Sequence, residues 1–398
     1  MLKGNVLRCY PNATQRQQLI QMFGNQRFVW NQMLNMLNER HKNNIHVPFP
    51  TAYGLNYMLK ALKQEYPFLK ESLSQALQMD CEALHEAFIR MFKHVNGHPK
   101  FKSRKCNYQS FTGKQGCIAV AKHYLKVPKL GYLKVSCTDT IAGHPIKRFT
   151  VKVTPTGKYY VSVNYKSESQ ALKSTDEQVG IDLNTGELAV LSDGTRIPTL
   201  NLRPLERKLR VEQRKLSRRY ERTKIERAHD QIVCPDNVRE LIDFPNYQRQ
   251  RRCVARLNAK IKHKRQNYLQ QVTTWLVRHY DTIVIEDLKV SNLVENHHLA
   301  RKIEHQSWYE FRRELTYKCA WYGKQLVVVD PKNTSRTCSH CGQKNHEFDD
   351  LTTNQWLSTR QWDCPHCGVH HDRDINAANN ILNKGLALLA RSGTGLGK

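Results

Sequence analysis

The spacing of apolar residues divides the first half of this chain into blocks with different predicted structures. Residues 1–10 alternate as a short strand, whereas residues 11–95 carry apolar side chains at roughly helical spacing, with Thr14 as the expected cap of the first helix. From about 106 to 170 the period falls toward two, which predicts strands joined by glycine turns. If the early strand completes a later β-barrel, the helical block is an insertion.

The second half of the chain is predicted to form an α/β unit interrupted by long helices. Its expected strands are 179–183, 187–191, 195–197, 282–286 and 325–329. Basic helices are expected between 201 and 280, with residues 229–247 as a loop between two of them. The last helix is expected over 372–384, and the tail 387–398 is expected to be disordered.

The basic segment has an apolar helical face with cations mostly off it. The apolar residues are Val254, Leu257, Ile261, Tyr268, Val272 and Trp275. The cations are Arg256, Lys260, Lys262, Lys264 and Arg265. A solvated face is the usual role of such charges, but their density here favours contact with phosphates.

Charge points to the same kind of partner. The chain holds 63 Lys and Arg against 35 Asp and Glu, a formal net charge of +28 over 398 residues. Such an excess costs self-repulsion when no partner is bound. It favours a polyphosphate, because each neutralised phosphate releases counterions. The alternative, a basic protein with a solvated surface, explains less of the pattern.

Two absences set the expected compartment. No apolar run reaches the ~20 residues of a membrane span, and the N-terminus lacks the layout of a secretory signal. Of twelve cysteines, four form two Cys-x-x-Cys pairs and eight are scattered singly, as expected for small core residues. This usage favours a reducing cytoplasm.

The two cysteine pairs predict a structural zinc site. They lie 22 residues apart, and four thiolates can close a tetrahedral coordination sphere. The predicted ligands are Cys338, Cys341, Cys364 and Cys367. Nearby histidines could substitute but are expected to be bystanders or phosphate contacts; these are His340, His366, His370 and His371. The polar segment 342–363 is expected to loop out.

Three acids far apart in the sequence predict a second metal site. Asp182, Glu286 and Asp374 each lie in or at the end of an apolar element, where a carboxylate is costly unless something satisfies it. Gathered together they would hold Mg²⁺ or Mn²⁺, and two such ions could cleave a phosphodiester. Asp287 should point to the opposite face from Glu286, and Asp372 could cap the last helix.

At these residues the chain resembles TnpB, the transposon-encoded RNA-guided nucleases related to compact type V CRISPR effectors. The C-terminal motifs occur in the family's order. They are Gly180-Ile-Asp-Leu183, Ile283-Val-Ile-Glu-Asp-Leu288, Trp308-Tyr-Glu-Phe-Arg312, Trp321-Tyr-Gly323, Val328-Val-Asp-Pro331, Thr334-Ser-Arg-Thr-Cys-Ser-His-Cys-Gly342 and Asp372-Arg-Asp-Ile-Asn-Ala-Ala378. Gly97-His-Pro-Lys-Phe-Lys-Ser-Arg104 resembles the family's N-terminal signature.

The resemblance implies a multidomain α/β fold: a wedge β-barrel with an inserted helical recognition domain, then a ribonuclease H-like (RuvC) nuclease domain with a zinc-ribbon insertion. The implied boundaries are 1–10 and 106–172 for the wedge, 11–105 for the recognition domain, 173–331 and 371–386 for the nuclease, and 332–370 for the zinc ribbon. The catalytic triad would be Asp182, Glu286 and Asp374, and the four cysteines would be the zinc ligands.

The resemblance also implies the partners. A noncoding RNA from the transposon end would serve as the guide, base pairing would choose the double-stranded DNA target, and the protein would read a short adjacent motif. A monomer with one RNA would cut both DNA strands in turn at one site, using two Mg²⁺ or Mn²⁺ ions.

The chain departs from the family pattern at Asn184-Thr185, where the family often has glycine. This change flanks Asp182 without removing it, so activity is expected to survive. Two other functions stay open: a catalytically weak RNA-guided regulator that occupies DNA without cutting, and a transposase that uses the same acidic fold for strand transfer. The first would be expected to lose acids of the triad.

Overall fold

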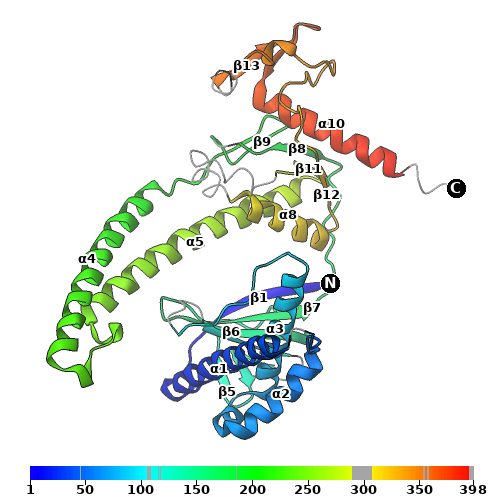
Figure 1. The fold of residues 1–398 in the computed structure, drawn as a ribbon. Helices are drawn as coiled ribbons and strands as arrows, with labels where there is room; N and C mark the ends of the chain where they lie inside the picture. Colours follow the sequence, from blue (N-terminus) through cyan, green and yellow to red (C-terminus); the bar gives the residue numbers. More distant parts are fainter. Residues whose placement is uncertain are drawn as a thin grey trace. The chain divides into compact units, whose positions relative to one another are not determined.

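The computed structural model divides into two compact units, Met1–Glu168 and Ser169–Lys398 (Figure 1). It describes the chain except residues 45, 105–108, 115, 117, 185, 289–306, 353–354, 356–357 and 394–398, and gives only the backbone of 392–393. Within the described residues, no helix is both long enough and apolar enough to cross a membrane.

The first unit contains two antiparallel sheets and a block of helices. One sheet has the order β1-β7-β6-β2, and comprises β1 (Leu2–Cys9), β7 (Tyr159–Lys166), β6 (Ile146–Val153) and β2 (Gln109–Lys114). The other comprises β3 (Ala119–Ala121), β4 (Tyr124–Val127) and β5 (Gly131–Lys134). The helical elements are α1 (Ala13–Asn43), α2 (Ala52–Glu65), the 3₁₀ turn η1 (Pro67–Glu71) and α3 (Ser74–Phe92).

The helices of this unit are an insertion between two strands of one sheet. β1 pairs with β7 along its whole length, from Leu2 opposite Lys166 to Cys9 opposite Tyr159, while the helices lie between β1 and β2 in sequence. The early strand therefore joins a later sheet, as its alternation predicted. Both sheets share one apolar core. Their closure into a barrel stays a prediction.

The cap of α1 differs from the expected one. Asn12, and not Thr14, is the N-cap: its side chain accepts a hydrogen bond from the Gln15 backbone N–H at 2.8 Å, and the Gln15 side chain accepts one from Asn12 N–H at 3.1 Å. This reciprocal capping box satisfies two backbone donors, so it outcompetes a single Thr cap two residues later.

The second unit is built on a five-stranded sheet of order β10-β9-β8-β11-β12. Its strands are β8 (Gln178–Asp182), β9 (Ala189–Leu191), β10 (Arg196–Ile197), β11 (Thr282–Glu286) and β12 (Gln325–Val329). β8, β11 and β12 are parallel, whereas β9 and β10 run antiparallel to their neighbours. The first three strands in sequence thus form a meander, and two parallel strands extend it.

Helices cover both faces of this sheet (Figure 1). On one face, α5 (Pro245–His279) and α8 (Trp308–Tyr322) pack against Ile181, Ile283 and Ile285. On the other, Ile381 of α10 (Arg373–Gly393) packs against Val284 and Val329. Because side chains alternate along a strand, Asp182 and Glu286 share the face of Gly180 and Val284, which is the face that α10 covers.

The remaining elements complete the second unit. They are α4 (Arg203–Val233), the 3₁₀ turns η2 (Pro235–Asn237), η3 (Leu241–Asp243) and η4 (His346–Phe348), and the hairpin of β13 (Gln361–Asp363) and β14 (His370–Asp372). The loop expected over 229–247 is shorter, because α4 continues to Val233 and α5 begins at Pro245.

The C-terminal expectation is wrong in part. α10 continues to Gly393, so residues 387–393 are helical and not a disordered tail, and the helix does not end at 384. The sequence Leu386-Ala-Leu-Leu-Ala390 is rich in strong helix formers, which carry the helix past the sheet it covers. Residues 394–398 lie outside the described residues.

Candidate active site and metal centres

Asp182 and Glu286 end two neighbouring parallel strands. β8 and β11 pair with Ile181 opposite Ile285, and the two acids are the next residues on each strand. Adjacent strands lie about 4.8 Å apart. The register therefore brings the two carboxylates side by side on the face that α10 covers, although 104 residues separate them in the sequence.

Asp374 reaches this site because α10 lies directly on the backbone of the sheet. A Cβ at Gly180 would fall 2.0 Å from the Ala378 carbonyl oxygen and 2.7 Å from Leu382 N, so only glycine fits there. Gly385 makes a similar approach, since its Cβ would lie 2.5 Å from Val284 Cγ1. Asp374 is one helical turn before Ala378, which puts it near the Asp182 end of β8.

The pKa of Asp182 responds to both of the other acids. Burial raises the pKa of Asp182 well above its usual range, and the neighbouring charges of Glu286 and Asp374 raise it further, against the opposing effect of Arg373. Burial likewise raises the pKa of Glu286. Three oxygen donors whose charges oppose each other fit a divalent cation, because its positive charge removes the repulsion.

Asn184 contacts two of the acids, a role that sequence reasoning missed. Its Nδ2 donates to Asp374 Oδ2 at 3.4 Å, and its side chain also hydrogen-bonds Asp182. Its Oδ1 accepts the backbone N–H groups of Gly186 at 3.0 Å and Glu187 at 2.8 Å, which fixes the loop after β8. A glycine here could make none of these side-chain bonds. Thr185 lies outside the described residues.

Arginines hold the other contacts of Asp374. Arg373 donates through Nε and Nη2 to Oδ1, both at 3.1 Å, and Arg360 Nη1 donates to Oδ2 at 3.3 Å. Arg373 is buried, whereas the Arg360 side chain is exposed. Asp374 is therefore held in place on both oxygens.

The two acids next to the triad behave as expected. Asp372 Oδ1 accepts the backbone N–H groups of Asp374 and Ile375, both at 3.1 Å, so it caps α10. Asp287 forms an ion pair with Arg312 of α8, on the opposite face of the sheet from α10. Both predictions are confirmed, and neither residue is available as a substitute for Glu286 or Asp374.

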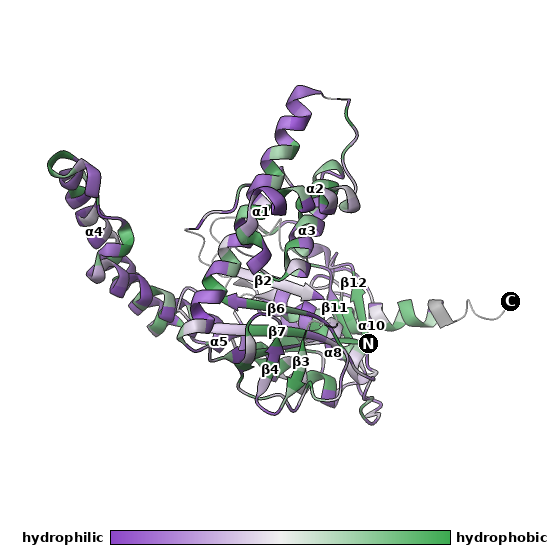
Figure 2. Ribbon diagram, turned by 90° about the horizontal axis from the view of Figure 1, so that it is seen from below, coloured by the Kyte–Doolittle hydropathy of each residue, from purple (hydrophilic) through white to green (hydrophobic). Residues whose placement is uncertain are grey.

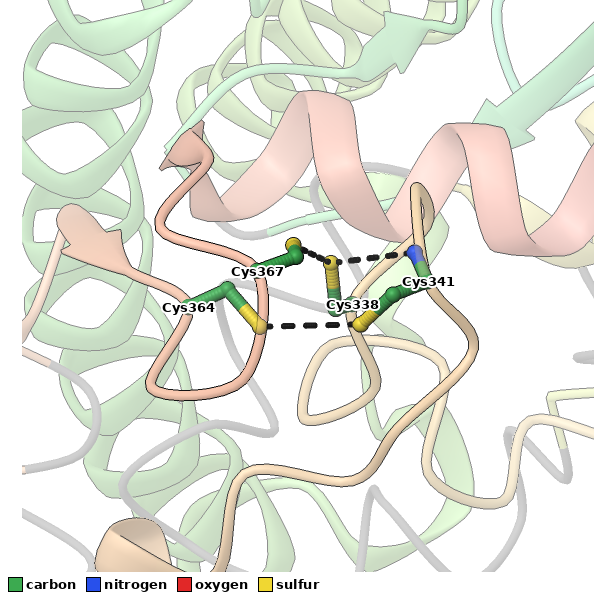
Figure 3. Close-up of side chains that lie close together, drawn as sticks. All are labelled: Cys338, Cys341, Cys364 and Cys367. Carbon is green, nitrogen blue, oxygen red and sulfur yellow. Dashed lines mark hydrogen bonds between the residues drawn. The ribbon is translucent and has the colours of Figure 1, made fainter.

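The four predicted zinc ligands form a tight cluster (Figure 3). Their sulfur atoms all lie within 4.8 Å of one another, and the pairs Cys338–Cys367 and Cys341–Cys364 are each 3.7 Å apart. Zinc–sulfur bonds of about 2.3 Å imply tetrahedral S···S edges of about 3.8 Å. The donor set and its spacing therefore fit one zinc ion.

The carboxylates are gathered more loosely. Across the described part of the chain, the cysteines are the one group of three or more metal-binding side chains whose ligand atoms all lie within 4.8 Å of one another. Of the four histidines near the knuckles, His371 lies closest to a ligand: its Nε2 is 3.0 Å from Cys338 Sγ and its ring stacks 4.6 Å from Trp362. It can donate a hydrogen bond to the thiolate and so support the cluster from outside.

The polarity of the segment between the cysteine pairs predicted that it loops out, but part of it packs against the cysteines. Phe348 and Trp362 are buried against Cys338 and Cys364, with their ring centroids 5.3 Å apart. Asn345 is 1% exposed, and its Oδ1 accepts the Glu347 N–H at 3.0 Å. Two aromatic rings thus give the cysteine cluster a small apolar core, which the mostly polar composition of the segment did not indicate.

Two asparagines on α10 connect this cysteine module to the acids. Asn376 Nδ2 donates to Thr337 O at 2.8 Å, and Asn376 Oδ1 accepts Ser339 N–H at 2.8 Å. One turn later, Asn380 Nδ2 donates to Thr334 O at 2.8 Å and to Thr337 O at 2.7 Å. The segment leading into the first knuckle is therefore bound to the helix that carries Asp374.

Thr334 continues this connection to the second strand acid. Its hydroxyl donates to Glu286 Oε1 at 2.6 Å, and both residues are buried. Lys384 donates to the carbonyl oxygens of Asp330 and Lys332, so the same segment is also tied to the middle of α10. Glu286, Thr334 and the first cysteine knuckle thus form one hydrogen-bonded assembly.

Comparison with known proteins identifies the family. A protein of Escherichia coli (strain K12) named "Putative RNA-guided DNA endonuclease InsQ" is 32% identical over 96% of this chain and 91% of its own length. A "Putative RNA-guided DNA endonuclease" of Streptomyces pristinaespiralis is 32% identical over 96% and 89%. This chain belongs to the TnpB family.

Three domain families match parts of this TnpB-family chain. Residues 308–381 match the family described as "Cas12f1-like, TNB domain", residues 159–297 match "Probable transposase", and residues 1–46 match "Helix-turn-helix domain". The solved structure of the mini-RNA-guided endonuclease CRISPR-Cas_phi3 aligns with a TM-score of 0.46 at 11% identity, covering 97% of this chain and 92% of that one.

The long helices α4 and α5 of this TnpB-family chain carry many basic residues, and α4 is mostly hydrophilic (Figure 2). α5 contains nine Lys or Arg and no Asp or Glu. Its predicted cations Arg256, Lys260, Lys262 and Lys264 are exposed, but Arg265 is half-buried. Within the described part of the chain, the Arg265 Nε has no hydrogen-bond partner. Four of the five candidates can therefore reach a phosphate freely.

Proposed function

We propose that this chain is an RNA-guided DNA endonuclease whose phosphodiester-cleaving site is formed by Asp182, Glu286 and Asp374. The observation that supports the proposal is that Asp182 and Glu286 end neighbouring strands on the sheet face that α10 covers, and that the pKa of Asp182, raised mainly by burial, is raised further by the charges of Glu286 and Asp374. The 32% identity to two proteins named RNA-guided DNA endonucleases, over nearly the whole chain, supports the same activity.

The three carboxylates would hold two Mg²⁺ or Mn²⁺ ions. Such ions activate the attacking water and stabilise the departing 3′ oxygen. Asp182, whose pKa is raised by burial and by both other acids, would supply a ligand to this metal site. Asn184 and Thr334 orient the carboxylates through the hydrogen bonds described above, and Arg360, exposed beside Asp374, can contact a DNA phosphate.

The same proposal assigns roles to the rest of the chain. The sheet order of the second unit, a three-strand meander followed by two parallel strands, supports a ribonuclease H-like nuclease domain over 173–331 and 371–386. The cysteine module over 332–370 would bind zinc and contact the target DNA. In the first unit, 1–10 and 106–172 would form the wedge and 11–105 the recognition domain.

The partners follow from this division of labour. Guide RNA from the transposon end would select a double-stranded target by base pairing, while the protein holds backbones and reads a short motif beside the target. The exposed cations of α5 would contact the RNA or the heteroduplex by their phosphates. One protein with one RNA would cut both strands in turn.

The test is cleavage by the purified protein–RNA complex. Matched duplex DNA and Mg²⁺ should give cuts that EDTA and the Asp182→Ala variant both abolish, while RNA binding persists. Cutting that survives either treatment would defeat the assignment. Tight DNA binding without nicking, in Mg²⁺ or Mn²⁺, would indicate an RNA-guided regulator, and joining of DNA ends would indicate a transposase.

A further inference from the structure

A cavity of about 270 Å³ lies beside Glu286, next to the site assigned to the metal ions. Leu183 and Leu288, which follow the two acidic strands, give it apolar walls, and Trp308 and Tyr309 from the first turn of α8 add aromatic ones. Whatever occupies this cavity therefore lies against Glu286, at the end of β11, and against two aromatic residues of α8.

Trp308 has an unmet hydrogen bond. The residue is 5% exposed, yet its indole Nε1–H finds no acceptor among the residues that the structure describes. Buried Trp N–H groups usually have a partner, because leaving a buried donor unpaired is costly. The proposed carboxylate chemistry does not use this donor. An acceptor brought in by a ligand would satisfy it.

Tyr309 and Arg312 complete the lining of the cavity and, unlike Trp308, have exposed side chains. Tyr309 is 67% exposed, so its ring is open to a stacking partner. The Arg312 side chain is 39% exposed and pairs with Asp287 at the rim. A stacking ring, a cation and a buried donor in one cavity are the groups that bind a nucleobase and its phosphate.

We propose that this cavity holds the base of one unpaired nucleotide that flanks the scissile phosphate, stacked on Tyr309 and hydrogen-bonded by Trp308. The proposal rests on the nuclease function proposed above. The volume lies just below the about 300–1,000 Å³ of sites that enclose larger ligands, so it suits a single base. A base inside a duplex is already stacked, so the strand must enter single-stranded.

The test uses the protein–RNA complex carrying Asp182→Ala, which prevents cutting. Single-stranded oligonucleotides carry the fluorescent base 2-aminopurine at successive positions around the cut site. Stacking on Tyr309 should quench the probe at one or two adjacent positions. Tyr309→Ala should remove the quenching and weaken binding about 10-fold, whereas Tyr309→Phe, which keeps the ring, should retain both.

A second variant separates the hydrogen bond from stacking. Trp308→Phe keeps an aromatic wall without the N–H, so the quenching should persist while the dependence of affinity on the identity of that base weakens by several-fold. Unchanged base preference in Trp308→Phe would remove the role assigned to the indole. Unchanged quenching in Tyr309→Ala would overturn the subsite.

The outcomes also distinguish this inference from the function it rests on. If the unaltered complex cuts DNA with Mg²⁺ but no position is quenched, the subsite is wrong and the nuclease stands. If Tyr309-dependent quenching occurs but the unaltered complex does not cut, the subsite stands and the nuclease assignment fails.

Discussion

The cysteine cluster and the acidic cluster belong to one unit of the chain but are assembled in opposite ways. Four cysteines from two short knuckles place their sulfur atoms within 4.8 Å of one another, at the spacing of a zinc tetrahedron. The three acids come from β8, β11 and α10; burial raises the pKa of Asp182, and the charges of Glu286 and Asp374 raise it further.

The difference matches the two kinds of metal site. A closed sulfur site holds structure together, so losing a ligand should destabilise the protein. An open oxygen site keeps positions for substrate and tolerates repulsion among its ligands until a cation binds. Removing a cysteine ligand should therefore lower the stability of the folded protein. Removing one of the acids should raise that stability when no metal is bound.

The largest expected effect is at the cysteines. The double variant Cys338→Ser, Cys364→Ser should lose zinc, whose binding in small zinc modules contributes about 10–16 kcal/mol. The segment 338–371 should then unfold and cleavage should fall to background, because Thr334 and α10 lose their support. Metal analysis, limited proteolysis and cleavage assays check this; full activity without zinc would break the coupling.

The acid variant should show the opposite response in stability. Asp182→Asn should reduce cutting on the order of 10⁴-fold. In EDTA it should raise the free energy of unfolding by about 1–3 kcal/mol, and the melting temperature should rise with it. The folded-state pKa of Asp182 is raised, so metal-free stability falls as pH rises from about 4 through that pKa. The melting temperatures of the unaltered protein and Asp182→Asn, measured in EDTA from pH 5 to 8, should therefore converge at low pH. An Asp182→Asn variant less stable than the unaltered protein would contradict this.

Gly180 tests whether both centres depend on how α10 is seated. Gly180→Ala should push the helix off the sheet, at a cost of about 1–3 kcal/mol or more, and should reduce cutting while zinc content is retained. Gly186→Ala is the matched control, because its Cβ would meet no atom closer than 3.5 Å. Equal melting temperatures and cutting rates for the two variants would rule out close packing of α10 against the sheet at Gly180.

Thr334 tests the link between the centres. Thr334→Val removes the hydroxyl that holds Glu286 at nearly constant volume, so cutting should fall about 10–100-fold with a higher Mg²⁺ requirement. Thr334→Ser keeps the hydroxyl and should restore most of the activity. Binding of Mn²⁺ measured by calorimetry gives a readout independent of cutting, and identical affinities in the two variants would argue against the link.

The smallest effect is expected far from both centres. Replacing Lys262 and Lys264 by Ala should leave zinc content and the Mg²⁺ requirement unchanged. Each lost phosphate contact should reduce the slope of log affinity against log salt by about 1. Binding titrations of RNA between low and physiological salt measure this; an unaltered slope would show that these lysines do not touch the nucleic acid.

Much of this architecture could be predicted without coordinates because it is local. The strands that end at Asp182 and Glu286 contain β-branched residues and the residue alternation typical of β-strands. The cysteine spacing alone defines two knuckles. Asp372 was predictable as a cap, since a cap needs only its own neighbours. Local competition also explains the errors at Thr14 and at residues 387–393.

Contacts between distant segments could not be predicted, because no periodicity records them. That Asn184 reaches Asp374, that Thr334 holds Glu286 and that Asn380 ties the first knuckle to α10 depend on how the helix lies across the sheet. The sequence by itself determined which side chains could bind metal and how the elements alternate. Only the tertiary structure decided their meeting, because close packing over Gly180 fixes where α10, and with it Asp374, comes to lie.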